Sequence, residues 1–275
     1  ADVEEIRHLI AKHGGHMEII PKIENLAGVN NFDEILAVSD GIMVARGDLG
    51  VEVPAEDVPV IQKEIIRKCN AVGKPVIVAT QMLESMTTNP RPTRAEVSDV
   101  GNAIFDGADA IMLSGETASG DYPVEAVKTM STIALRMEQS LEYDSIIRAR
   151  SIRERSSVTD AVSHATVQLA YETSAAAILT PTQSGYTTRV VSKYRPKAMI
   201  VAYAPSPMIA RHINLRWGVY PMQGRKWTSV EDMIESCTRG ALSHGYVKQG
   251  DKVVMVAGMT YNEGGSVAVR VTTIH

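Results

Sequence analysis

Lys22 and Glu24 are the residues whose type and spacing point most directly to chemistry. They stand two positions apart in the segment IIPKIEN, and side chains two apart on a strand project from the same face. Asp48 follows the next apolar run, in the segment MVARGDLG. The pattern therefore predicts one lysine and two carboxylates at a common site.

Two carboxylates in such a site can bind a divalent cation. Their oxygens are hard ligands, which favours Mg²⁺ over Zn²⁺. The ammonium group of Lys22 then stays available to neutralise a transferring phosphoryl group or an enolate oxygen. A buried ion pair between Lys22 and Glu24 that only stabilises the fold is an equally good interpretation of these two residues alone.

Three more groups follow apolar runs of the sequence. Gly47 and Gly50 flank Asp48, and glycine lets backbone N–H groups approach an anionic ligand closely. Thr80, in VIVATQM, could position a water molecule or relay a proton to an enolate carbon, and Ser114, in MLSGETA, ends a comparable run. A glycine turn, a strand threonine and a helix cap are the structural alternatives for these groups.

The elements that must position these residues alternate between short apolar runs and helical patterns. Four runs are predicted to be buried parallel strands: 17–24, 40–48, 74–82 and 108–116. Helical patterns separate them, and Gly73 and Gly107 are expected to end two helices in the left-handed conformation. The polar residues all lie at the carboxyl ends of the predicted strands, which is where reactants bind in parallel α/β folds.

Four such units form half of an eight-stranded barrel. The sequence also opens on a helical pattern with no strand before it, so we expect further barrel residues upstream of Ala1. The predicted fold class is α/β, with the second half of a TIM (β/α)₈ barrel followed by a smaller α/β domain.

A charged stretch, LEYDSIIRARSIRERSS, marks the predicted domain boundary. We place the barrel half at residues 1–145 and a C-terminal α/β regulatory domain at residues 146–275. Ser157 and Thr159 are the candidate caps of the first helix there. Five strands are expected, the last two as an antiparallel pair: 175–180, 198–203, 218–222, 252–258 and 266–274.

A hydroxyl-rich loop in this second half is a candidate phosphate site. Thr182, Ser184, Gly185 and Thr187 lie between a strand and a helix, where hydroxyls and amide groups can surround a phosphate. An ordinary N-cap with solvated hydroxyls is the alternative. A weaker prediction adds two short segments to this site: 225–227 and 263–266.

The bulk properties narrow the classes of function. The chain has 275 residues, a formal net charge of −4 and two cysteines. Acidic and basic residues are interleaved, which argues against a nucleic-acid binder. No apolar run is long enough for a membrane span, no signal peptide is evident and no disulfide framework is indicated. A cytoplasmic protein without membrane or nucleic-acid partners is expected.

Five segments together resemble a known family. In their order and spacing, PKIEN, MVARGDLG, ATQMLESM, NPRPTRAEVSDV and MLSGETASGDYP are similar to the second half of the pyruvate kinase catalytic barrel. The resemblance implies a phosphotransferase of glycolysis that converts phosphoenolpyruvate and ADP to pyruvate and ATP. A metal-dependent aldolase or lyase of pyruvate-like substrates is the alternative enzyme, and an effector-binding fragment without catalysis is the alternative outside enzymes.

The resemblance also assigns roles to individual residues. Lys22 stabilises the phosphoryl group in transfer, while Glu24 and Asp48 bind Mg²⁺ or Mn²⁺. Gly47 and Asp48 amides hold the substrate carboxylate, and Thr80 stands on the face of the enolate that is protonated. Ser114 joins the proton relay as a further catalytic residue.

The resemblance has wider implications as well. K⁺, a phosphorylated allosteric effector on the loop from Thr182 to Thr187 and a homotetramer are properties of the family. A complete enzyme of the family also has an earlier barrel half and a lid domain, so the chain alone is expected to be inactive.

Overall fold

The computed structural model describes residues 1–151, 157–258 and 267–275. They form two compact units, Ala1–Leu141 and Glu142–His275. The assignment of residues 1–145 and 146–275 to a catalytic and a regulatory domain remains a prediction.

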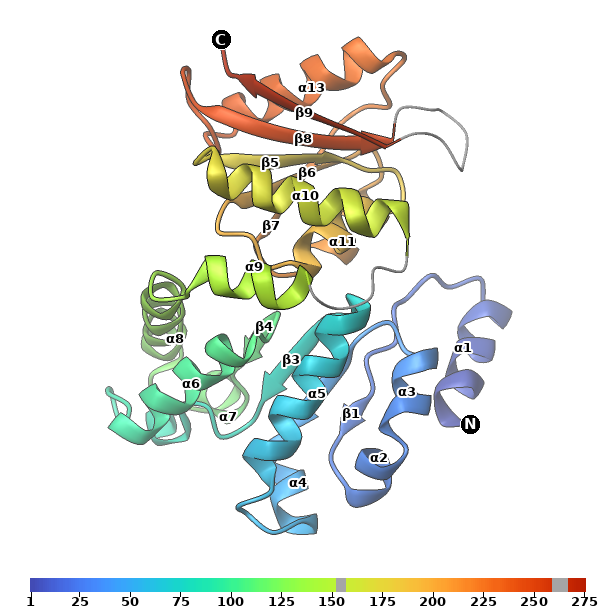
Figure 1. The fold of residues 1–275 in the computed structure, drawn as a ribbon. Helices are drawn as coiled ribbons and strands as arrows, with labels where there is room; N and C mark the ends of the chain where they lie inside the picture. Colours follow the sequence, from blue (N-terminus) through green and yellow to red (C-terminus); the bar gives the residue numbers. More distant parts are fainter. Residues whose placement is uncertain (152–156, 259–266) are drawn as a thin grey trace. The chain divides into compact units, whose positions relative to one another are not determined.

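The first unit is built on a four-stranded parallel sheet in the order β1-β2-β3-β4. Figure 1 labels β1, β3 and β4 of this sheet. The strands are shorter than the apolar runs that predicted them: β1 (Lys22–Ile23), β2 (Ile42–Ala45), β3 (Val76–Ala79) and β4 (Ala110–Met112). Helices connect them: α1 (Asp2–Lys12), α2 (Leu26–Asn30), α3 (Phe32–Val38), α4 (Arg46–Glu52), α5 (Val58–Val72), the 3₁₀ helix η1 (Glu84–Thr87), α6 (Arg94–Asp106), α7 (Gly115–Ala118) and α8 (Pro123–Glu138).

The core of this unit explains why its strands are continuous apolar runs. Val44 and Val78 are fully buried in the same cluster as Ile66 of α5 and Val100 of α6. Helices cover the faces of a parallel sheet, so its strands do not alternate between apolar and polar residues and are instead filled by β-branched and other apolar residues. The predicted parallel α/β pattern is confirmed.

Two helix ends in this unit were predicted from glycine and are confirmed. Gly73 follows α5 with φ of 68°, and Gly107 follows α6 with φ of 95°. Both lie in the left-handed region, where residues with a Cβ are disfavoured. Each glycine therefore ends a helix shortly before the chain enters the next strand.

The second unit contains a five-stranded sheet in the order β7-β6-β5-β8-β9. Its strands are β5 (Ala177–Pro181), β6 (Met199–Ala204), β7 (Val219–Gln223), β8 (Lys252–Gly258) and β9 (Val267–Thr273). Only β9 runs antiparallel, against β8, which confirms the predicted antiparallel pair. The helices are α9 (Tyr143–Ser151), α10 (Val158–Glu172), α11 (Tyr186–Lys193), α12 (Pro207–Ile213) and α13 (Val230–Ser243).

Both faces of this sheet are buried. Ile178 and Val254 belong to one hydrophobic cluster with Val167 of α10, while Leu179 and Val253 belong to another. The second cluster also holds residues of α13. Successive strand residues point to opposite faces, so the two clusters lie on the two sides of the sheet.

Among the two candidate caps of α10, the structure selects Ser157. Its hydroxyl accepts a hydrogen bond from the Asp160 amide at 3.1 Å. No helix in the described parts of the chain combines the length and the apolar character that crossing a membrane requires.

Candidate active site

The carboxyl ends of the four parallel strands bring the predicted residues to one edge of the first unit. Lys22 lies on β1, and Glu24 follows it directly. Gly47 and Asp48 lie in the first turn of α4, which begins where β2 ends. Thr80 comes directly after β3. The carboxyl ends of parallel strands all lie at the same edge of the sheet, so the sheet places these residues along that edge.

Lys22 joins the two predicted carboxylates. Its Nζ lies 2.6 Å from Glu24 Oε2 and 3.7 Å from Asp48 Oδ2. The hydrogen bond and charge of Glu24, followed by the weaker effect of Asp48, raise the pKa of Lys22 above its usual value. The ammonium therefore stays charged at neutral pH.

The side chains of this ion pair are not buried in the described residues, unlike the buried pair of the structural alternative. The side chains are 52% exposed for Lys22 and 37% for Glu24. Solvent screens ion pairs at such exposure, so they contribute little to folding. Three charged side chains instead converge at an accessible strand end.

Thr80 approaches the same segment of α4. Its Oγ1 accepts a hydrogen bond from the Gly47 amide at 2.7 Å and donates one to Ala79 O at 2.6 Å. The structure therefore brings Thr80 and Gly47 together, and Gly47 is the chain neighbour of Asp48.

The backbone at Thr80 is strained. Thr80 has φ of 68° and the next residue, Gln81, has φ of 53°. Left-handed conformations cost non-glycine residues about 1–3 kcal/mol each, and a β-branched residue there is a genuine outlier. Such strain persists only where surrounding contacts hold it, and it clusters at functional sites.

Arg46 supplies contacts of this kind, and the sequence did not predict its role. The residue is 7% exposed, and its Nη2 donates to Thr80 O at 2.7 Å and to Gln81 O at 3.2 Å. Its Nη1 lies 2.8 Å and 2.6 Å from the two carboxylate oxygens of Asp99 on α6. The only signal in the sequence was a charged residue at the end of an apolar run.

The start of α6 is fastened by Glu96. Its carboxylate accepts hydrogen bonds from the backbone amides of Ser85 and Thr93, both at 2.7 Å, and from both hydroxyls. Burial alone would raise the pKa of Glu96, but the hydrogen bonds from Ser85 and Thr93 outweigh burial and lower it. The helix that carries Asp99 is thereby tied to the chain that follows β3.

Ser114 occupies a different environment from the other predicted catalytic residues. It precedes α7, and its hydroxyl makes no capping hydrogen bond within the described chain. Its backbone amide donates to Glu116 Oε2 at 2.8 Å, while the Leu83 amide donates to Glu116 Oε1 at 3.0 Å. Glu116 is 0% exposed, so its carboxylate ties the segments after β3 and β4 together. Within the described residues, Ser114 makes no hydrogen bond to Lys22 or Thr80.

The hydroxyl-rich loop of the second unit lies at the carboxyl end of β5. Gly185 precedes α11 with φ of 82°, and its amide donates to Thr182 Oγ1 at 2.8 Å. The Tyr186 amide donates to Ser184 Oγ at 3.4 Å. Thr187 lies in the first turn of α11. The loop is thus closed by its own hydroxyls. The residue before α11 is Gly185, which has no side chain to cap the helix, and Thr182 is buried, so the alternative of an N-cap with solvated hydroxyls fits only Ser184, which is exposed.

The additional segments predicted for that loop gain no support. Arg225 forms a bidentate ion pair with Asp232, and this arginine with the Thr228 amide holds the pKa of Asp232 far below its usual value. Residues 263–266 lie outside the described residues.

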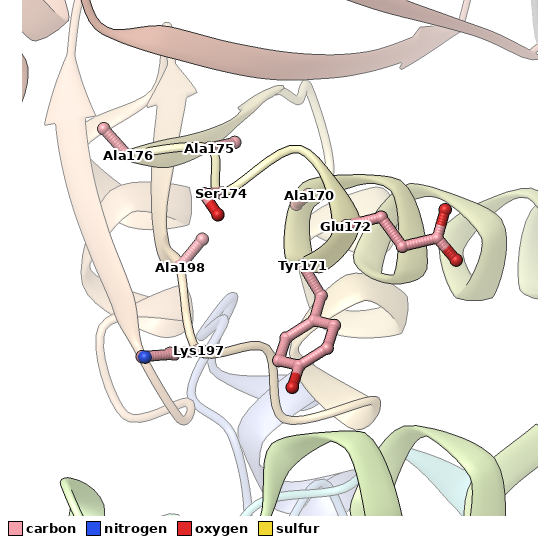
Figure 2. A pocket seen from close by; sticks show the side chains of 8 residues that line it. All are labelled: Ala170, Tyr171, Glu172, Ser174, Ala175, Ala176, Lys197 and Ala198. Carbon is pink, nitrogen blue, oxygen red and sulfur yellow. The ribbon is translucent and has the colours of Figure 1, made fainter.

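A cavity of about 590 Å³ in the second unit does not include the hydroxyl-rich loop. It lies near Ala176 and Ala198, which precede β5 and β6, so it is at the amino edge of the sheet. Figure 2 shows that the carboxylate of Glu172 and the ammonium of Lys197 point in different directions. They do not converge on a common ligand.

Comparison with known proteins identifies the family. Residues 1–127 match the family described as "Pyruvate kinase, barrel domain", and residues 160–272 match "Pyruvate kinase, alpha/beta domain". The chain belongs to the pyruvate kinase family. Its first unit contains the segment matched as the barrel domain, and the predicted fold class is confirmed.

Individual pyruvate kinases are similar over nearly the whole chain. The pyruvate kinase of Bacillus licheniformis is 53% identical over 275 residues, which are 100% of this chain and 47% of that protein. That of Geobacillus stearothermophilus is 54% identical over 97% of this chain and 46% of its own length. That of Clostridium acetobutylicum is 53% identical over 96% and 56%, respectively. The chain spans about half the length of the curated relatives it matches.

Proposed function

We propose that this chain supplies part of a pyruvate kinase active site, which transfers a phosphoryl group from phosphoenolpyruvate to ADP. The observation that carries the proposal is the approach of Lys22 Nζ to both Glu24 and Asp48 at an exposed strand end. Membership of the pyruvate kinase family supports the same reaction.

Lys22 is proposed to neutralise the phosphoryl group as it moves. Phosphoryl transfer has a loose transition state, so catalysis depends on alignment and on charge neutralisation. A charged and accessible ammonium meets that requirement.

The amides of Gly47 and Asp48 are proposed to hold the substrate carboxylate. They lie in the first turn of α4, whose partial positive charge favours an anion. The Gly47 amide already donates to Thr80 Oγ1, so the carboxylate would share this donor or displace the hydroxyl. Thr80 would then stand beside the enolate and pass a proton to its carbon, with Ser114 as a proposed second member of the relay.

Glu24 and Asp48 are the proposed ligands of Mg²⁺ or Mn²⁺. Both carboxylates already face one cation, the ammonium of Lys22. Among the described residues no cluster of three or more His, Cys, Asp or Glu side chains could hold a metal ion. Mg²⁺ suits this donor set because it commonly takes one or two carboxylates and completes its shell with water and phosphate oxygens. When bound, the ion would supply charge stabilisation to phosphate and enolate oxygens.

The function is tested by a pyruvate assay with phosphoenolpyruvate and ADP in the protein carrying this sequence. Chelation by EDTA is expected to abolish turnover, and added Mg²⁺ to restore it. Glu24→Gln should raise the Mg²⁺ concentration needed for half-maximal rate by about 10-fold to 100-fold, because one ligand is weakened. Glu64→Gln is the matched control, since Glu64 pairs with Lys68 on α5.

The same assay separates the two enzyme classes. Cleavage of a carbon–carbon bond in a pyruvate-like substrate without any need for nucleotide would favour the aldolase or lyase and refute the kinase. An unchanged Mg²⁺ requirement in Glu24→Gln would refute the assignment of this ligand.

We further propose that the loop from Thr182 to Thr187 binds the phosphate of an allosteric effector. Its support is the position of Ser184, Gly185 and Thr187 around the start of α11, with exposed hydroxyl at Ser184. K⁺, a homotetramer and a cytoplasmic location are proposed from the family alone, and no described residue is assigned to K⁺.

Calorimetry with a sugar monophosphate and with AMP tests this loop. Thr187→Val keeps the shape but removes one hydroxyl, and should weaken binding by about 5-fold to 15-fold, the value of one hydrogen bond. Thr238→Val on α13 is the control, because its hydroxyl bonds within its own helix. Equal affinities in the chain and in Thr187→Val would contradict the proposed site.

A further inference from the structure

Thr80 and Gln81 form a left-handed pair directly after β3. Their φ values are 68° and 53°, and neither residue is glycine or asparagine, the types that tolerate this region best. A β-branched threonine is especially disfavoured there. Local sequence therefore gives no reason for this conformation, and a tertiary contact must hold it.

The guanidinium of Arg46 makes that contact with both residues. Its Nη2 donates to Thr80 O at 2.7 Å and to Gln81 O at 3.2 Å. The planar fork of arginine can serve several acceptors at fixed angles, which a lysine ammonium cannot reproduce. One buried side chain thus fixes two consecutive strained carbonyls.

Asp99 keeps this buried cation in place. It receives Nη1 of Arg46 at 2.8 Å, and Gln62 Oε1 lies 3.5 Å from the same nitrogen. A buried charge without a counter-ion would be strongly unfavourable. Asp99 lies on α6, so the ion pair fixes the position of the guanidinium relative to this helix.

The hydroxyl of Thr80 is oriented as a consequence. With the backbone held in this conformation, Thr80 Oγ1 meets the Gly47 amide at 2.7 Å. Gly47 follows Arg46 in the sequence, so one short segment holds both the carbonyl and the hydroxyl of Thr80. Arg46 itself is 7% exposed, and its guanidinium hydrogen-bonds to protein atoms.

We propose that Arg46, held by Asp99, is a positioning residue for the proton-transfer step. It keeps Thr80 and Gln81 left-handed, so that the Thr80 hydroxyl faces the place where the enolate forms. This inference rests on the function proposed above. It concerns a residue that acts through Thr80 and does not touch the substrate.

The test compares Arg46→Lys with the double variant Arg46→Lys/Gln81→Gly. Arg46→Lys keeps the charge but loses the fork. Glycine at position 81 adopts positive φ without strain. It should therefore replace part of the effect of the hydrogen bonds from Arg46 to Thr80 O and Gln81 O, which we call the Arg46 clamp. Arg7→Lys is the matched control, because Arg7 Nη2 also joins a backbone carbonyl, Val38 O, to a carboxylate, Asp40.

Two readouts separate positioning from a general loss of structure. The first is the exchange of pyruvate methyl protons with solvent, which reports proton transfer apart from phosphoryl transfer. Arg46→Lys should slow it by about 10-fold to 100-fold, since small misplacements of a catalytic group have effects of this size. The double variant should recover at least several-fold, and the KM for pyruvate should stay nearly constant throughout.

The second readout is hydrogen exchange at the Gly47 amide, which needs no activity. It should accelerate in Arg46→Lys, slow again in the double variant, and stay unchanged in Arg7→Lys. Faster Gly47 exchange in a protein without any pyruvate chemistry would support the clamp and refute only the proposed function.

Three results would overturn the inference. They are unchanged Gly47 exchange in Arg46→Lys, an equal loss of proton exchange in Arg7→Lys, and no recovery in the double variant. Should Arg46→Lys not fold, Asp99→Asn serves instead, because it keeps the guanidinium and removes its counter-charge. Gly47 exchange that is unchanged in Asp99→Asn then overturns the inference, and faster exchange supports it.

Discussion

Replacing Lys22 with methionine should lower kcat for phosphoryl transfer by about 10³-fold or more in the protein carrying this sequence. Methionine keeps much of the length of the side chain but removes its charge. The variant then faces a phosphoryl group with no ammonium beside it, and Glu24 and Asp48 lose the cation that both approach. Steady-state kinetics with phosphoenolpyruvate and ADP measure the effect.

Lys68→Met provides the matched control for this prediction. Lys68 also lies near two carboxylates, Asp33 at 2.8 Å and Glu64 at 3.3 Å, and the hydrogen bond with Asp33 leads the effects that raise its pKa. It lies on α5, away from the strand ends, so its loss should leave kcat nearly unchanged.

The pH dependence follows from the raised pKa of Lys22. A lysine with a raised pKa loses its proton only above its usual range near 10.5, so its charge is constant at neutral pH. We therefore expect no change of rate near pH 7 to 8 from Lys22 itself. Turnover of Lys22→Met within tenfold of the unchanged protein would contradict the role given to this residue.

Replacing Glu116 with alanine should reduce the free energy of unfolding of the first unit by about 2–5 kcal/mol. The Glu116 carboxylate is fully buried and accepts the amides of Leu83 and Ser114. Alanine leaves both donors without an acceptor, and each unsatisfied buried donor costs about 1–3 kcal/mol. Denaturant unfolding, followed by a probe in this unit, measures the loss.

Two further variants sharpen this measurement. Glu116→Gln keeps one carbonyl oxygen but turns an amide NH₂ toward the other donor, so we expect an intermediate loss. Glu125→Ala removes an exposed carboxylate in the first turn of α8 and should cost about 0.5 kcal/mol. A loss below 1 kcal/mol for Glu116→Ala would show that the carboxylate does not join the segments after β3 and β4.

Several features of the fold could be predicted because neighbouring residues decide them. The parts of the predicted runs that form β2 and β3 are apolar at every position, as strands buried on both faces require. Gly73 and Gly107 could be assigned to helix ends because only glycine enters the left-handed region easily. The spacing of two between Lys22 and Glu24 placed them on one strand face before any contact was known.

Other features could not be predicted because residues far apart in the sequence decide them. Arg46 pairs with Asp99, which lies 53 positions later in the sequence, and no local sequence pattern predicts that pair. Thr80 and Gln81 have no local preference for positive φ, so sequence reasoning expected an ordinary strand end. In the sequence, Glu116 is an acidic residue at the start of a predicted helix. In the structure it is buried, and its carboxylate accepts hydrogen bonds from the backbone amides of Leu83 and Ser114.

The sequence by itself therefore determined the alternation of strands and helices, the edge at which Lys22, Glu24, Asp48 and Thr80 gather, and the family. The spacing of apolar residues, the positions of glycines and the order of the motifs carry that information, and each can be recognised within short segments of sequence. Only the tertiary structure decided that the lysine and its carboxylates are accessible, and that Arg46 holds Thr80 in a strained conformation. The reason is physical: burial, ion pairing and backbone strain are set by long-range packing, and a linear pattern does not encode which distant side chain supplies the contact.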